Sequence, residues 1–192
     1  MSGRASCGTA SDALVFGGYT NPSQVPNGAT DRYNGVVWTA QAVMNIPRYW
    51  LQGAGTASDA LSMGGVFNQG GGILNLSPNT ERYDGIVWTV KANMLLRRYS
   101  GAACGTATSA LIFGGTTGGA GASQSSTQEY DGVGNTWSVR ANLNVGRIGL
   151  AGAGTTSDAL SFGGYNGAMG GAIPTTERYQ GGVSIKTFTV TP

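Results

Sequence analysis

The chain has 192 residues, of which 40% are hydrophobic and only 10% are charged, and its formal net charge is +2. This weak charge, with no Lys/Arg cluster longer than Arg97-Arg98, argues against nucleic acid as a partner, and the chain has no run of 18 apolar residues that would insert into a membrane. The 34 glycines and the regular short apolar runs favour strands and turns over helices.

One unit of sequence recurs four times along the chain. Its most regular stretch has the pattern Ala-Leu-x-Phe/Met-Gly-Gly, and successive copies lie 47, 50 and 49 residues apart. The copies occupy residues 13–18, 60–65, 110–115 and 159–164. A period of this size is typical of a propeller or a solenoid. We therefore expect a single domain over residues 1–192, built from units at about 1–47, 48–97, 98–146 and 147–192.

Each unit is expected to begin with a strand of small residues. In the second unit this strand ends in Gly53, Ala54 and Gly55. The matching residues in the other units are Ser6-Cys7-Gly8, Ala103-Cys104-Gly105 and Gly152-Ala153-Gly154. Strands that crowd around an axis need small side chains, so we place this strand innermost. A tight turn, Ala57-Ser58-Asp59 in the second unit, follows it.

The repeated Ala-Leu-x-Phe-Gly-Gly stretch is the second strand. Leu14 and Phe16 share one face at a period of two, and the glycine pair ends the strand by adopting backbone conformations closed to other residues. Loops that differ in length and sequence come next, and such variability is typical of surface loops. These loops span residues 19–29, 66–79, 116–126 and 165–175.

The third and fourth strands carry the aromatic residues. In the second unit the third strand is Thr80-Glu81-Arg82-Tyr83, and it runs into an Asp-Gly turn. The fourth strand carries Trp88, with Trp38 and Trp137 at the same place in units one and three, and in unit four we expect Phe188 to take the place of tryptophan. Because aromatic side chains dominate core area, we expect each Tyr and Trp to pack between units.

The order of these elements resembles the kelch repeat. A Gly-Gly doublet, a Tyr-Asp-Gly segment, a tryptophan and an arginine at the next inner strand follow one another, and the resemblance covers all four units. It implies an all-β fold, a four-bladed kelch-like β-propeller in which each blade is a four-stranded antiparallel sheet. The segments Gly-Thr-x-Ser-Asp-Ala-Leu-x-Phe-Gly-Gly and Glu-Arg-Tyr-Asp-Gly also resemble, more loosely, repeat proteins of marine bacteriophages and environmental viruses.

The pattern leaves the closure of the ring open. Kelch propellers usually have more than four blades. This chain starts on a first strand and ends on a fourth, so no blade combines strands from both termini. Two arrangements are compatible with the sequence: four blades that close alone, or an open set completed by another copy.

The sequence contains no arrangement of residues suited to catalysis. Histidine, the commonest general base, is absent. Cys7 and Cys104 share one register in units that are not neighbours, so we expect buried, unpaired thiols rather than a disulfide or a Cys/His nucleophile. All nine acidic residues lie in repeat registers, whereas a catalytic pair would break the repeat. We expect a non-enzymatic protein without a metal or cofactor.

The candidate binding residues cluster at one face. In an antiparallel four-stranded blade, the loop between strands two and three lies on the same face as the connection to the next blade. That face combines the variable loops with arginine and aromatic residues, the types that anchor interfaces. The expected ligand-binding residues are Arg48, Tyr49, Trp50, Arg97, Arg98, Tyr99 and Arg147. Alternatively, the arginines at 48, 98 and 147 only satisfy carbonyl groups of the inner strands.

These observations and the resemblance together favour a non-enzymatic binding or structural module. The leading expectation is a phage virion component of the tail, fibre or surface that binds protein or host-surface glycan through its loop face. Its partners would be other virion subunits or further copies of itself as a homo-oligomer, without nucleic acid and without membrane insertion. The amino terminus lacks the pattern of a signal peptide, so the expected location is the virion or otherwise the cytoplasm. The alternatives are an intracellular kelch-type interaction scaffold and, less favoured, a glycan-active propeller enzyme.

Overall fold

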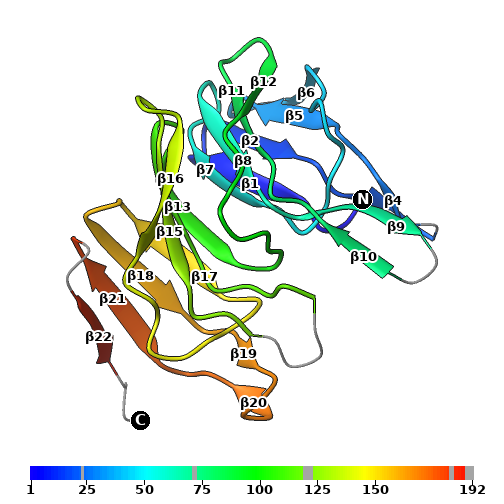
Figure 1. Ribbon diagram of the computed structural model, residues 1–192. Coiled ribbons are helices and arrows are strands. Elements are labelled where there is room, and N and C mark those ends of the chain that lie inside the picture. Colours follow the sequence, from blue (N-terminus) through cyan, green and yellow to red (C-terminus); the bar gives the residue numbers. More distant parts are fainter. Residues whose placement is uncertain (23, 71–72, 119–122, 182–183, 189–192) are drawn as a thin grey trace.

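The computed structural model describes residues 1–22, 24–70, 73–118, 123–181 and 184–188. It is all-β, with four antiparallel sheets of four strands arranged as the blades of a four-bladed β-propeller (Figure 1). Blade 1 contains β1 (Ala5–Gly8), β2 (Ala13–Phe16), β5 (Thr30–Tyr33) and β6 (Trp38–Gln41). Blade 2 contains β7 (Gln52–Gly55), β8 (Ala60–Met63), β11 (Thr80–Tyr83) and β12 (Trp88–Lys91).

The other two blades repeat this order. Blade 3 contains β13 (Ala102–Thr106), β14 (Ser109–Phe113), β15 (Thr127–Asp131) and β16 (Thr136–Arg140). Blade 4 contains β17 (Ala151–Gly154), β18 (Asp158–Phe162), β21 (Thr176–Gln180) and β22 (Ser184–Phe188). No helix in the described ranges is long and apolar enough to cross a bilayer.

The strand of small residues is innermost, as predicted. Strand β1 packs against β7, β7 against β13, and β13 against β17. A Cβ atom at Gly53 would lie 2.8 Å from Cζ of Phe16 and 3.0 Å from the carbonyl oxygen of Ser6. Small residues recur in these strands because neighbouring inner strands leave no room for larger ones.

Aromatic side chains join each blade to the one before it. Trp88 of blade 2 meets Phe16 of blade 1 edge to face, with ring centroids 5.0 Å apart, and its indole Nε1 donates to Thr30 Oγ1. Trp137 of blade 3 likewise donates to the carbonyl oxygen of Ala92 in the connection after blade 2. The prediction that tyrosine and tryptophan pack between units is thereby confirmed for these blades.

Phe188 does not replace the missing tryptophan of the fourth unit, so that prediction is wrong. The tyrosine of the third strand pairs with the tryptophan of the fourth in the first three blades, as Tyr33 does with Trp38. In blade 4 the residue opposite Tyr179 is Ile185, and Phe188 lies opposite Thr176 at the far end of the strand pair. The position in register with the tryptophans is thus six residues after Tyr179, whereas Phe188 is nine residues after it.

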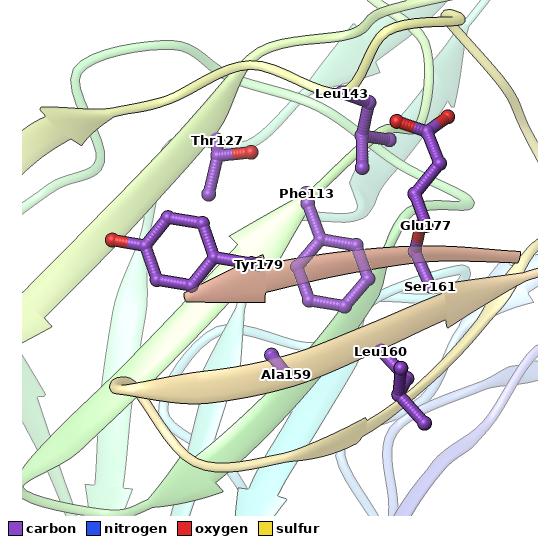
Figure 2. Close-up of a pocket in the computed structure, with 8 residues that line it drawn as sticks. All are labelled: Phe113, Thr127, Leu143, Ala159, Leu160, Ser161, Glu177 and Tyr179. Carbon is purple, nitrogen blue, oxygen red and sulfur yellow. The ribbon is translucent and has the colours of Figure 1, made fainter. Parts of the chain in front are cut away.

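A small cavity, drawn in Figure 2, lies next to the fourth blade. This cavity lies between blades 3 and 4, beside Phe113, and is lined by apolar groups and by Thr127, Ser161 and Glu177. Its volume of about 10 Å³ corresponds to about one water molecule. It is too small for an organic ligand.

The row of blades is open between blade 4 and blade 1. Figure 1 shows blade 1 at the upper right and blade 4 at the lower left, at opposite ends of the row. Both β1 and β17 lie within the described residues, and no packing comparable with that of the internal inner strands joins them. The four blades of the single chain therefore do not close on themselves, and completion by another copy stays a prediction.

The variable loops project from one side of the row, at the lower right in Figure 1. Three of them form two-stranded ribbons rather than irregular loops. The ribbons are β3 (Tyr19–Thr20) with β4 (Val25–Pro26), β9 (Val66–Gly70) with β10 (Ile73–Leu76), and β19 (Tyr165–Asn166) with β20 (Gly171–Ala172). Backbone bridges such as Tyr49–Val66 and Tyr99–Thr116 tie the connections between blades to these loops. The two sets of segments thus share a face, as predicted.

Candidate functional site

The three arginines of the predicted site are interior residues. Arg48, Arg98 and Arg147 each have 0% exposure. Arg48 donates to the carbonyl oxygens of Gly64 and Asn79, to Ser62 Oγ and to Glu81 Oε1. The guanidinium groups reach inward to the carbonyl that follows the second strand and to one that precedes the third, as Arg48 does to Gly64 and Asn79. Their geometry fits the alternative reading, in which they satisfy backbone carbonyls.

In blades 2 and 4 a carboxylate beside the arginine extends this network to the connection between blades. Glu81 accepts hydrogen bonds from the backbone N–H groups of Asn45 and Ile46, and Glu177 accepts them from Asn144 and Val145 in the same way. Burial lowers the pKa of Arg48 to about 10, against the opposing charge of Glu81. The arginine therefore stays charged at neutral pH, and its charge is balanced within the blade.

Blades 1 and 3 vary this network. In blade 1, Arg4 forms an ion pair with Asp31 at 2.8 Å and donates to the carbonyl oxygens of Val15 and Ala29. In blade 3 the acidic position holds Gln128, and Arg98 has only neutral acceptors within the described residues: the Gly114 and Ser126 carbonyls and Ser126 Oγ. Burial lowers the pKa of Arg98 to about 10 as well.

The aromatic members of the predicted site do come together. Trp50 stacks on Tyr99 with ring centroids 5.4 Å apart and planes 21° apart, and it meets Tyr49 edge to face at 4.9 Å. Tyr19 completes the group, 5.0 Å from Tyr49 and 6.2 Å from Trp50. Tyr49 is buried, whereas the other three rings are partly exposed. We refer to Tyr19, Tyr49, Trp50 and Tyr99 as the aromatic cluster.

The cluster draws one residue from the loop of blade 1 and the rest from two connections between blades. Sequence reasoning missed Tyr19 because it opens a variable loop, where no repeat pattern marks it. The available signal was the Gly-Gly-Tyr sequence, since the glycine pair fixes the direction in which the next residue leaves the sheet. Arg97 is exposed in the same connection as Tyr99.

The backbone beneath the cluster is strained. Trp50 has φ of +53°, and Ser100, at the same repeat position, also has φ of +53°, while Gly3 and Gly149 supply glycine there. Trp50 N donates to the Gly3 carbonyl, Ser100 N to the Trp50 carbonyl, and Gly149 N to the Ser100 carbonyl. This chain of bonds crosses all four blades and holds the position left-handed. A bulky side chain is unfavourable in that conformation.

The cluster presents uncharged rings. Burial raises the pKa of Tyr99, and burial together with Tyr19 and Tyr99 raises the pKa of Tyr49. Both phenols are neutral at neutral pH. Partly exposed aromatic rings on a rigid scaffold are suited to binding through contact area and hydroxyl hydrogen bonds, rather than to proton transfer.

The opposite face contains paired charges. Arg32, Arg82 and Arg178 bind Asp12, Asp59 and Asp158 of the inner turns, each through two nitrogen–oxygen contacts of 2.6–3.0 Å. The strand-three arginines thus pair with the turn of their own blade, not with the neighbouring acid in sequence. Within the described ranges no cluster of three or more His, Cys, Asp or Glu residues could hold a metal ion.

Comparison with known proteins places the chain in no family. No protein-family model matches it, and no curated protein matches it.

Proposed function

We propose that the protein is a non-enzymatic binding module whose loop face, centred on the aromatic cluster, holds a macromolecular ligand. The observation that carries this proposal is Trp50 at φ +53°. Strained conformations of bulky residues persist where the surroundings enforce them, and they concentrate at functional sites. The fold needs only glycine at this position, as Gly3 and Gly149 demonstrate.

The remaining features support the same assignment. Trp50 and Tyr99 are held face to face on segments tied to the rigid inner strands by backbone bonds. Tryptophan and tyrosine are the residues that most often dominate binding energy, and exposed Arg97 lies next to them in sequence. We revise the proposed contact set to Tyr19, Trp50, Arg97 and Tyr99, because the buried arginines and Tyr49 support the surface from below.

The kelch-like character of the repeat and its likeness to bacteriophage proteins lead us to propose a virion role. In that setting the ligand is another virion protein or a glycan of the host surface. A gene neighbourhood of capsid and tail genes would support this placement, and one without phage genes would favour an intracellular interaction scaffold instead.

The proposal is tested with labelled protein on an array of bacterial surface polysaccharides and on intact bacteria. The double variant Trp50→Gly/Tyr99→Ala should lose binding by about 30-fold or more, which corresponds to about 2 kcal/mol, the scale of a binding hot spot. The control is Asp59→Ala/Asp158→Ala on the opposite face, which should bind as the wild type does. Equal binding by the aromatic variant, or loss only in the control, would contradict the proposal.

A further inference from the structure

The two ends of the row expose surfaces that every internal blade buries. The side of a blade that faces the preceding blade, its leading side, carries the tryptophan. Trp88 of blade 2 and Trp137 of blade 3 are covered there and are 5% and 7% exposed, whereas Trp38 of blade 1 is 53% exposed. The alanines that flank the tryptophan follow the same pattern. Ala57, Ala60, Ala107 and Ala110 are 0% exposed, but Ala10 is exposed and Ala13 is partly exposed. We call Ala10, Ala13, Tyr33 and Trp38 the tryptophan face.

The other side of a blade, its trailing side, faces the next blade along the chain. On blade 4 the residues of this side are exposed. Phe16 of blade 1 and Phe113 of blade 3 are 0% and 3% exposed, but Phe162 of blade 4 is 40% exposed. Leu160 is likewise open, whereas its counterparts Leu14, Leu61 and Leu111 are buried. Ala151 and Ala153 of the inner strand are exposed too. We call Ala151, Ala153, Leu160 and Phe162 the leucine face.

Internal interfaces show what covers such surfaces. In each of the three internal cores, the leading side of one blade packs on the trailing side of the blade before it. Between blades 1 and 2, Trp88 and Tyr83 pack with Leu14 and Phe16. The tryptophan face carries the same residue types as the leading side of blade 2. The leucine face matches the trailing side of blade 1 except that Ala153 stands where blade 1 has Cys7.

We propose that the tryptophan face of one copy of this chain docks on the leucine face of a second copy, continuing the blade stack across molecules. The interface is head to tail, since each copy supplies one face of each kind. If the rotation between copies closes, two chains form one ring of eight blades, and otherwise a longer series forms. The occupant is a second copy because this chain's own blades are what cover the equivalent faces at three internal interfaces.

The first test uses one variant per face. Trp38→Glu and Phe162→Glu each place a charge on an exposed position. By sedimentation and light scattering from 1 to 200 µM, the wild type should self-associate, and each variant alone should lose the closed ring or longer series. Because each variant keeps one intact face, an equimolar mixture should form a 1:1 pair and nothing larger. Val133→Glu, at a 96% exposed position outside both faces, should behave as the wild type.

A cross-link provides a second measurement, because a covalent bond can also trap a weakly associated pair. A Cβ atom at Gly53 would lie 3.4 Å from Cβ of Ala5, and one at Gly152 would lie 3.2 Å from Cβ of Ala102. In the proposed interface Ser6 takes the place of Gly53, and Ala151 that of Ala5. These distances are close to the separation of about 3.5–4.5 Å in a disulfide.

In a Cys7→Ala/Cys104→Ala background, Ser6→Cys protein mixed with Ala151→Cys protein should therefore form a covalent dimer on mild oxidation. Ser6→Cys mixed with Val133→Cys should not. A wild type that stays monomeric throughout the concentration range and gives no Ser6–Ala151 cross-link would overturn the proposal. So would a mixture of Trp38→Glu and Phe162→Glu that remains monomeric while the wild type associates. The loop-face variant Trp50→Gly/Tyr99→Ala should associate normally, which separates this inference from the proposed function.

Discussion

Trp50 stacks on Tyr99 at a ring separation of 5.4 Å while its own backbone is held at φ +53°. The contact joins the connection before blade 2 to the connection before blade 3. The same two connections are bonded through Ser100 N and the Trp50 carbonyl, 3.1 Å apart. The stack and the strain therefore have one origin, the chain of left-handed residues that crosses the blades.

This relationship predicts an unusual order of stability among Trp50 variants. Trp50→Ala loses the ring and keeps the strain, whereas Trp50→Gly loses both. The glycine variant should be more stable than the alanine variant by about 1 kcal/mol, since a left-handed conformation costs an L-residue about 1–2 kcal/mol. Urea unfolding of the two proteins measures this difference. Leu95, which is exposed and does not have a positive φ, is the control position, and there alanine should be better tolerated than glycine.

Crowding between inner strands makes a prediction for Ala54. This residue is 4% exposed and packs in the core between blades 2 and 3. Ala54→Leu should lower the free energy of unfolding by about 1–3 kcal/mol through overpacking. Ala153 is at the same repeat position but is exposed at the open end, so Ala153→Leu should leave the stability of the monomer nearly unchanged. Equal melting temperatures for the two variants would contradict the assignment of the inner strands.

The uneven arginine network predicts a stabilising substitution. Arg98 is buried, and Gln128 holds the repeat position of Glu81 and Glu177, which pair with the arginines of blades 2 and 4. Gln128→Glu supplies the missing charge and keeps the acceptor for Leu95 N. Stability should rise by about 1–3 kcal/mol, because a buried charge without a counter-charge is costly. Glu81→Gln, the reverse change in blade 2, should destabilise, and a loss of stability in both variants would refute this explanation.

The thiols of Cys7 and Cys104 should react slowly with thiol reagents unless the pH is strongly alkaline. Burial raises the pKa of Cys7 and of Cys104 from 9.0 to about 12, with Asp59 adding to the effect at Cys7. The predicted absence of a disulfide is confirmed, since both cysteines are free. Reaction with a disulfide reagent at pH 8 should be slow in native protein and fast in urea, because only the thiolate reacts.

The raised pKa values of the two thiols also predict how the stability of the protein changes with pH. Unfolded thiols ionise near pH 9, whereas the native thiols remain protonated to about pH 12. The native state therefore binds more protons in this window, and the stability that the thiols contribute below pH 9 is lost as the pH rises from 9 toward 12. Cys7→Ala/Cys104→Ala should show a shallower decline over this window, and an identical decline would indicate that the thiols are not the cause.

The repeating elements of the fold could be predicted from the amino-acid sequence. The residues in register predicted strand order, the innermost position of strands such as β7, the packing of Trp88 between blades and the face that carries the variable loops. These features follow from local patterns, alternation along a strand and small size near an axis, so each unit specifies them independently. Because the pattern occurs four times, each copy supports the same prediction.

Tertiary structure decided what depends on distances between units. Arg48 appears in sequence as a candidate surface residue, yet its guanidinium reaches the Asn79 carbonyl and Glu81, 31 and 33 residues further along the chain. Tyr19 joins Trp50 only because the glycine pair and the neighbouring blade bring their segments together. Whether blade 4 meets blade 1 depends on the angle between successive blades. Side-chain packing at each interface sets that angle, and the repeat pattern, which is the same for an open and a closed row, does not encode it.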